Sequence, residues 1–339
     1  MGWGIIVGRR TKKGYKPPFL HWLLKPKEKG SDINGRGERT FRRPRPVYHF
    51  RDTPEVRLAF RHVQQLFYMR MYKTKSFHQR IQDRKFNITR PLVDIAPAKQ
   101  TDTAESWTKK VKEFSLANEA DLVGIARMRP EWVFEGYEIE QPWIIMHAVK
   151  QDYEKIATAP DYTTNEEVLD QYNRAHRANF ALANWIREQG HYAERYKGFL
   201  GTPITMIPPA IAAGLGQLGK HGSLINRTLG PNFRLGYVVT DMPLISDNED
   251  DIPVDDFCMS CQICTRECPT EAISDSKQWV RGVEKWYVDF DKCVPFFNDT
   301  FGCNVCVATC PFSRPNVSEP LLMKLLKRKD KRLAEAAAE

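Results

Sequence analysis

All eight cysteines of this 339-residue chain lie between residues 258 and 310. They form two runs, Cys258-x2-Cys261-x2-Cys264-x3-Cys268-Pro and Cys293-x9-Cys303-x2-Cys306-x3-Cys310-Pro. The proline after each run prevents a helix from continuing past the last cysteine. So many thiols on such short loops indicate a segment that folds around a thiolate-binding group, and this constrains about a sixth of the chain.

Two other uses of cysteine fit the pattern less well. A disulfide framework is typical of small secreted chains, whereas these cysteines occupy a small part of a long chain. Structural zinc accepts sets of four cysteines, but zinc ribbons usually show paired C-x2-C units rather than C-x2-C-x2-C followed by C-P. The pattern therefore favours iron–sulfur clusters over zinc and over disulfides.

The run C-x2-C-x2-C-x3-C-P is that of bacterial ferredoxin domains, in which the last cysteine of each run binds the cluster of the other run. Applied to this chain, the rule predicts two [4Fe–4S] clusters with crossed ligands. Cluster 1 would take Cys258, Cys261, Cys264 and Cys310, and cluster 2 would take Cys268, Cys293, Cys303 and Cys306. No cysteine is left over.

The remaining composition is that of an ordinary globular chain, with 42% hydrophobic and 27% charged residues. No apolar run approaches the roughly 18 residues of a membrane span. Arg9-Arg10 is followed by polar residues rather than by the apolar region of an export signal. We therefore expect a cytoplasmic protein without a membrane span.

The formal net charge of +9 is concentrated at the N-terminus. Residues 1–50 carry 13 Lys and Arg against three acidic residues, so the remaining 289 residues carry a net charge of about −1. This basic arm is rich in glycine and proline and is poorly suited to forming a core of its own. It suits nucleic acid, an acidic electron donor or the protein's own surface, and the last of these is the simplest interpretation.

Hydrophobic periodicity predicts helices at 55–85 and 111–120, and buried strands at 121–126 and 143–149. A long helix is expected from Thr164 to Gln189, with Thr164 and Glu167 as a capping box and Gly190 at its end. The alternation of helices and strands indicates an α/β core. The segment from Leu321 to the C-terminus is predicted to be a charged helix.

On the long helix, Tyr172 shares a face with His176, Asn179 and Ala183. Such a mixed polar face can line a pocket. The alternative is that Tyr172 packs and forms hydrogen bonds while His176 and Asn179 face solvent.

A glycine-rich segment at 214–224 contains a literal G-x-G-x-x-G. A dinucleotide-binding fold needs a strand before this motif and a helix after it. Here Pro208-Pro209 predicts the opening of a helix before it, and no long helix follows. We therefore reject the dinucleotide interpretation and keep only the close backbone approach to a bulky ligand that four glycines permit.

The order of these motifs resembles that of the cobalamin-dependent reductive dehalogenase family. The motifs are the long Tyr172 helix, the GLG-x-x-GKHGS-L loop, the segments 230–234 and 240–244, and the two cysteine runs. The related epoxyqueuosine reductases share part of this set. The resemblance covers roughly residues 110–315.

The resemblance implies a nitroreductase-like α/β fold that holds a base-off corrinoid, followed by a ferredoxin-like domain that delivers electrons to cobalt. The expected units are a basic arm (1–50), a helical segment (51–110), a corrinoid-binding core (111–250), a ferredoxin-like 2[4Fe–4S] domain (251–316) and a helical tail (317–339). The expected corrinoid contacts are Gly214, Gly216, Gly219, Lys220, His221, Gly222, Ser223 and Leu224.

Within the family pattern, Tyr172 occupies the place of the catalytic tyrosine and Arg234 that of its cationic partner. Replacing carbon–halogen by carbon–hydrogen needs two electrons and one proton. Tyr172 is therefore predicted to be the general acid, and Arg234 to stabilise the phenolate that remains. The expected substrate is a small organohalide, with a halogenated phenol favoured, and the expected donor is a separate ferredoxin or flavodoxin.

Two alternatives remain open. An epoxyqueuosine reductase would act on tRNA, which suits the basic arm, and would use Asp170 as proton donor. The chain beyond residue 50 is nearly neutral, which argues against a nucleic-acid partner. A corrinoid-free electron carrier would show iron–sulfur absorbance without corrinoid bands.

Overall fold

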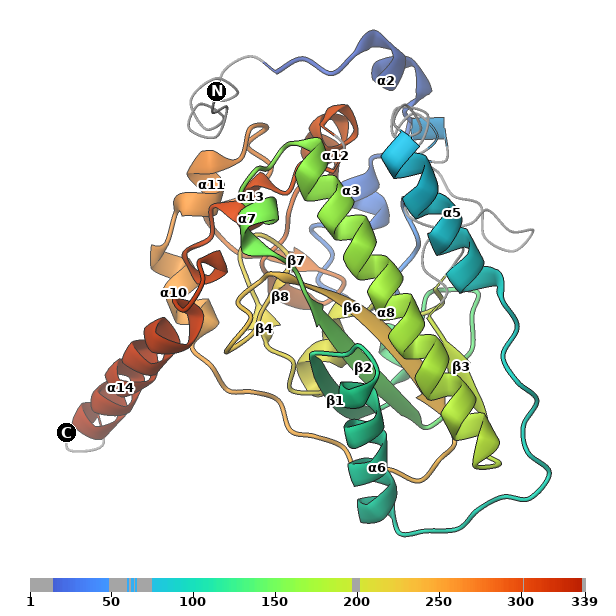
Figure 1. The fold of residues 1–339 in the computed structure, drawn as a ribbon. Helices are drawn as coiled ribbons and strands as arrows, with labels where there is room; N and C mark the ends of the chain where they lie inside the picture. Colours follow the sequence, from blue (N-terminus) through green and yellow to red (C-terminus); the bar gives the residue numbers. More distant parts are fainter. Residues whose placement is uncertain are drawn as a thin grey trace.

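The computed structural model describes residues 15–48, 60, 62, 63, 65, 75–196, 202–300 and 302–336. Its centre is a four-stranded antiparallel sheet in the order β1-β2-β6-β3 (Figure 1). The strands are β1 (Leu122–Arg127), β2 (Trp143–Lys150), β6 (Phe233–Thr240) and β3 (Ala193–Arg195). The predicted strands at 121–126 and 143–149 are confirmed as β1 and β2. The chain is a mixed α and β protein, as predicted.

Both faces of this sheet are buried. Along β2, Ile144 and Met146 pack into one hydrophobic cluster, while Ile145 packs into another with Leu182 and Val238. Helices α6 (Ala104–Ala117) and α8 (Tyr162–Glu188) cover the second face, and α9 (Ile207–Ala212) lies against the first, in contact with β1 and β2. Alternating side chains of one strand therefore supply the cores of two layers.

The helix predicted at 111–120 begins earlier than its apolar pattern suggested. Thr103 caps α6 by accepting a hydrogen bond from the backbone N–H of Ser106 at 3.1 Å. The buried residues Trp107, Val111 and Ser115 then recur every four positions along α6. The helix is therefore anchored by a turn that precedes the predicted range.

The long helix is confirmed as α8, but the predicted capping box is wrong. Asp161 accepts a hydrogen bond from the N–H of Tyr162, so Thr164 lies inside the helix and donates to Lys155 O. Glu167 accepts hydrogen bonds from Asp152 N and Lys155 Nζ and ties α8 to α7 (Tyr153–Ile156). Gly190 follows the helix with a φ of +80°, as the prediction of a glycine end requires.

The helix predicted at 55–85 lies largely outside the described residues. Its last part is α5 (Lys75–Thr89), which continues four residues further and packs against α8. The C-terminal helix α14 runs from Ser318 to Ala336, three residues earlier than predicted at its start. In the described part of the chain, no helix is both long and apolar enough to cross a membrane.

The cysteine-bearing segment forms short helices around two small sheets. The helices are α10 (Val254–Ser260), α11 (Ile263–Glu267), α12 (Phe290–Asp299), α13 (Val305–Ala308) and the 3-10 turn Pro311–Ser313. Strands β7 (Gln278–Val280) and β8 (Val283–Lys285) pair beside them, and β4 (Gln217–Leu218) pairs with β5 (Leu224–Ile225). Helix α11 packs against α13, so the two cysteine runs lie side by side.

The described part of the basic arm lies over the protein's own surface, as the simplest interpretation predicted. Helix α3 (Gly30–Ile33) begins where Gly30 N and Ser31 N donate to the carboxylate of Asp291. Arg36 pairs with Asp289, and Arg43 donates to Val133 O at 3.0 Å. The arm therefore connects the cysteine-bearing segment to the sheet domain.

His147 on β2 is a fully buried histidine in the sheet domain. Its Nδ1 lies 2.8 Å from Asn179 Oδ1, and its Nε2 lies 3.0 Å from Ser115 Oγ. Since an amide oxygen only accepts, Nδ1 carries the hydrogen and Nε2 accepts from Ser115. Burial lowers the pKa of His147 to about 4, and the hydrogen bond to Asn179 opposes the shift.

We expect His147 to make the protein less stable in acid. Below pH 6.5 the unfolded chain binds a proton that the folded chain does not bind until about pH 4, so the free energy of unfolding falls across this window. Between pH 6.5 and pH 5 the loss is about 2 kcal/mol. Anaerobic denaturant titrations at both pH values should show a smaller loss in His147→Gln. The exposed His62→Gln should match the parent; an equal loss in all three proteins contradicts the assignment.

Candidate functional site

The structure brings the last cysteine of the second run next to the first run. The Cys310 thiol interacts electrostatically with those of Cys258, Cys264 and Cys261. Cys258 lies in α10, Cys264 lies in α11, and Cys310 precedes the turn at Pro311. We call these four residues quartet 1.

The remaining four cysteines form quartet 2. Cys306 interacts with Cys303, Cys293 and Cys268, and Cys293 interacts with Cys303 and Cys268. The fourth cysteine of the first run thus lies among the cysteines of the second. This is the crossed arrangement that the ferredoxin pattern predicts.

Both quartets consist of free thiols that are buried or half-buried. Burial raises the pKa of Cys258 to about 12 and that of Cys264 to about 11, and it raises the pKa of Cys306 well above its ordinary value. Since thiolate is the form that binds metal, a positive group must compensate for the charge in these sites. Among the described residues, no group of three or more His, Cys, Asp or Glu side chains is arranged so that it could hold a single metal ion.

The glycine-rich segment forms a β-hairpin whose tip lies against quartet 1. Strands β4 and β5 pair, and Gly219 N donates to Ser223 O at 2.9 Å across the turn. The prediction that no dinucleotide-type strand and helix flank this segment is confirmed, because α9 precedes it and β5 follows. A Cβ on Gly216, whose φ is +133°, would lie 2.3 Å from Ile225 O, and one on Gly214 would lie 2.6 Å from Asn248 O. At these positions the close neighbour is the chain's own backbone.

Lys220, at the tip of this hairpin, is a buried cation beside quartet 1. Only 1% of it is exposed; its Nζ donates to Cys261 O at 3.2 Å and lies 4.6 Å from the centre of the Trp286 ring. Its backbone N–H and its ammonium charge oppose the rise in the pKa of Cys258. A buried cation is costly unless negative charge lies nearby, and an anionic cluster bound in quartet 1 would supply that charge.

We expect Lys220→Met to make the cluster in quartet 1 harder to reduce. Removing a buried positive charge destabilises the more negative, reduced state, so the reduction potential should become more negative. Redox titration followed by electron paramagnetic resonance measures this directly. Lys277 also lies over Trp286, at 5.8 Å, but pairs with Asp255 at the surface, so Lys277→Met is the matched control. Equal potentials in the two variants would contradict the prediction.

His221, the next residue of the hairpin tip, has a defined neutral tautomer. Its Nδ1 accepts a hydrogen bond from Ser223 N at 3.2 Å, so its ring hydrogen is on Nε2. Burial lowers the pKa of His221 to about 4. The buried Nε2 has no hydrogen-bond partner within the described part of the chain. His221 is thus prepared to donate to a bound group.

The structure places Tyr172 and Arg234 together, although they are 62 positions apart in the sequence. Tyr172 is half-buried in the middle of α8, and Arg234 lies near the start of β6, where β6 pairs with the end of β2. The guanidinium carbon of Arg234 is 5.5 Å from the centre of the Tyr172 ring. A proton-bearing phenol therefore lies beside a permanent positive charge.

Two buried polar residues that are not among the predicted site residues lie next to this pair. Gln151 follows β2 and donates its N–H to Asn232 O at 2.9 Å, two residues before Arg234. Asn232 also donates its side-chain amide to Ser313 O, which places this region beside the cysteine-bearing segment. Gln151 directly follows β2 and Asn232 directly precedes β6, and these ends pair with each other. A polar residue at the end of a buried strand is the signal that could have identified them.

Several buried polar atoms at this junction have no partner among the described residues. They are both amide atoms of Gln151, Asn232 Oδ1 and Arg234 Nε. Buried polar atoms are rarely left unsatisfied unless they bind water or a ligand. A large ligand with amide side chains, such as a corrinoid, would satisfy them, so the residues present fit this group.

The predicted polar face of α8 is only partly a pocket. His176 and Asn179 are buried, so the alternative that they face solvent is wrong. His176 stacks on Tyr196, with ring centres 5.2 Å apart, and Asn179 bonds His147. Close packing against the sheet explains the position of Asn179, because a Cβ on Gly236 of β6 would lie 2.4 Å from its side-chain amide.

Asp170, the proton donor of the alternative epoxyqueuosine reductase hypothesis, is engaged elsewhere. Its carboxylate pairs with the Arg80 guanidinium at 2.7 Å and 3.1 Å. Both carboxylate oxygens of Asp170 therefore accept hydrogen bonds from Arg80. In this structure Asp170 is therefore poorly suited to proton donation.

Comparison with known proteins gives relatives for both parts of the chain. Residues 257–313 match the 4Fe-4S dicluster domain family. The tetrachloroethene reductive dehalogenase of Sulfurospirillum multivorans is 30% identical over 272 residues, which cover 66% of this chain and 54% of that protein. The epoxyqueuosine reductase of Aliivibrio fischeri is 26% identical over 229 residues, which cover 54% of this chain and 58% of that protein.

The fold matches that of a reductive dehalogenase whose solved structure suggests a mechanism for B12-dependent dehalogenation. The TM-score is 0.70 at 24% identity, and the match covers 81% of this chain and 43% of that one. The chain thus spans about half of the length of the relatives it matches. The predicted resemblance to reductive dehalogenases is confirmed, with epoxyqueuosine reductases as more distant relatives.

Proposed function

We propose that this relative of the reductive dehalogenases replaces a carbon–halogen bond of an organohalide by a carbon–hydrogen bond. The observation that carries the proposal is the contact between Tyr172 and Arg234, bordered by unsatisfied buried groups of Gln151 and Asn232 and next to the cysteine-bearing segment. A bound corrinoid would supply the two-electron chemistry at cobalt. Gln151, Asn232, Arg234 and the hairpin-tip residues His221, Gly222 and Ser223 are the residues proposed to hold it.

The chain's own groups supply the proton and its electrostatic support. The Tyr172 hydroxyl gives its proton to the carbon that loses the halide, and the positive charge of Arg234 stabilises the phenolate that remains. Two electrons from the clusters and one proton convert carbon–halogen to carbon–hydrogen and free halide. Bulk solvent then reprotonates Tyr172, which is half-buried rather than sealed.

Arg234 also favours an anionic substrate. The guanidinium is a permanent cation, so it attracts a phenolate oxygen. We therefore propose halogenated phenols as the preferred class, reduced with electrons from a separate ferredoxin or flavodoxin. Uncharged chloroethenes lack that anionic oxygen and are the appropriate comparison.

The test is anaerobic reconstitution with iron, sulfide and cobalamin, followed by a reductant-driven assay. The panel contains halogenated phenols, chloroethenes and RNA that carries epoxyqueuosine. The expected result is corrinoid bands in the purified protein and stoichiometric halide release from the phenols. RNA reduction without halide release would overturn the proposal, and iron–sulfur absorbance without corrinoid binding would identify an electron carrier instead.

A further inference from the structure

The basic arm carries an apolar helix that is exposed to solvent. Helix α2 (Phe19–Leu24) buries His21 against the body, whereas Phe19 is 72% exposed and Trp22 is 61% exposed. The rings of Phe19 and Trp22 stack on each other with centres 6.0 Å apart. With the exposed Leu20 and Leu23, these residues form a contiguous apolar surface, which marks an interaction site rather than a folding element.

Lysines surround this apolar surface. Lys16, Lys25, Lys27 and Lys29 are all exposed, and residues 15–29 contain only Glu28 as an acidic residue, so this stretch has a net charge of +3. The chain beyond residue 50 is close to neutral. The excess positive charge therefore lies within the first 50 residues, and part of it lies on the α2 surface, which we define as residues 16–29.

The α2 surface lies beside quartet 2. A cavity of about 370 Å³ is lined on one side by Trp22 and Lys25, and on the other by Asp291, Val294 and Pro295 of α12. Cys293 of quartet 2 lies between Asp291 and Val294 in that helix. Quartet 1, by contrast, contacts the hairpin tip at Lys220.

We propose that the α2 surface is the docking site of a small acidic electron-carrier protein, which delivers electrons to quartet 2. Acidic side chains of the carrier would face the lysines, and the exposed aromatic rings would form the desolvated centre of the contact. Electrons then pass from the quartet 2 cluster to the quartet 1 cluster beside the hairpin. Only the identity of the final electron acceptor rests on the proposed function.

An anionic lipid surface would also accept lysines and exposed aromatic residues. The position beside Cys293 favours the carrier, because a redox partner requires a short route to a cluster and a lipid does not. The lipid surface is therefore kept as a competing outcome of the experiment.

The experiment measures reduction of the clusters of the chain, reconstituted with the isotope ⁵⁷Fe, by anaerobic rapid-freeze Mössbauer spectroscopy, which does not detect the clusters of an unlabelled carrier. The reductants are a reduced bacterial 2[4Fe–4S] ferredoxin, which is acidic, and dithionite. We expect Lys25→Glu/Lys27→Glu to lower the second-order rate with ferredoxin at least about tenfold at low salt and to flatten its salt dependence. Trp22→Ser should lower the rate with little change in salt dependence. Dithionite should reduce every variant at the parent rate.

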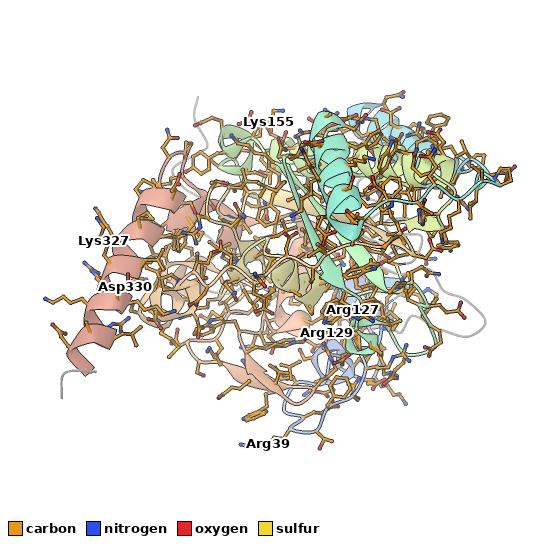
Figure 2. The ribbon with its side chains drawn as sticks, turned by 90° about the horizontal axis from the view of Figure 1, so that it is seen from below. Arg39, Arg127, Arg129, Lys155, Lys327 and Asp330 are labelled. Carbon is orange, nitrogen blue, oxygen red and sulfur yellow. The ribbon has the colours of Figure 1, made fainter. Side chains whose placement is uncertain are left out.

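The matched control is Lys324→Glu/Lys327→Glu on α14. Both lysines are exposed. Helix α14 extends from the molecule far from α2 (Figure 1), and the side chain of Lys327 lies on it (Figure 2). This control should keep the parent rate with both reductants. The proposal is overturned if Lys25→Glu/Lys27→Glu is reduced by ferredoxin at the parent rate. It is also overturned if the control variant loses as much of that rate. The surface is assigned to lipid if the parent binds anionic vesicles and Trp22→Ser abolishes this binding while the rate of reduction by ferredoxin is unchanged. Because cluster reduction is measured without cobalamin or organohalide, failure of dehalogenation leaves this result intact.

Discussion

Tyr172→Phe is expected to lower the turnover of the reconstituted protein by at least about a hundredfold, since a positioned general acid contributes roughly 10²–10⁴-fold. The substitution removes only the hydroxyl and keeps the ring that faces Arg234 at 5.5 Å. We therefore expect parent amounts of iron and corrinoid. Halide release under saturating reductant measures turnover, and metal analysis with visible spectra measures the cofactors.

The chain offers a matched control for this substitution. Tyr192 lies just beyond the other end of α8, also beside an arginine, with the Arg187 guanidinium carbon 5.9 Å from its ring centre. Tyr192→Phe should turn over like the parent. Full activity in Tyr172→Phe, or an equal loss in both variants, would remove Tyr172 from the role of proton donor.

The second large effect is expected from paired substitutions of cysteines. If the ligands cross between the runs, Cys258→Ser/Cys310→Ser removes two ligands of one cluster and should leave about half of the iron. Cys306→Ser/Cys310→Ser removes one ligand from each cluster and should cost most of the iron. The interactions of Cys310 with Cys258 and of Cys306 with Cys268 carry this expectation.

Iron content and electron paramagnetic resonance after anaerobic reconstitution separate the two outcomes. Thr309→Ala is a control within the same segment, because its hydroxyl donates to Val305 O rather than to a thiol. Uncrossed ligation predicts the reverse: Cys306→Ser/Cys310→Ser would then keep half of the iron. That reversal would contradict the division of the thiols into quartet 1 and quartet 2.

Local patterns predicted the elements whose causes are local. The runs at 121–126 and 143–149 became β1 and β2 because apolar, β-branched segments pair wherever both faces can be covered. Gly190 ends α8 because a residue with positive φ is needed there. The capping box failed because Asp161 offers a competing cap three residues earlier, while Glu167 is needed by Asp152 and Lys155.

Side-chain environments were predicted less well. Asn179 is a polar residue with ordinary helical spacing, and only the close approach of Gly236 and His147 shows that it is buried. Lys220 belonged to a glycine-rich motif that was expected to contact a corrinoid, yet its ammonium faces Cys261 O and Trp286. Such partners are distant in the chain, so no local pattern reports them.

The sequence by itself determined that this chain holds eight thiols in two ferredoxin-type runs. The spacing of cysteines along the chain is set by covalent bonds and does not depend on how the rest of the chain packs. The tertiary structure decided which surface meets each quartet: the hairpin with Lys220 contacts quartet 1, and the apolar helix of the arm lies beside quartet 2. It also placed Arg234 over Tyr172. These contacts depend on how the sheet, the arm and α12 pack against one another, and packing is a property of the whole chain.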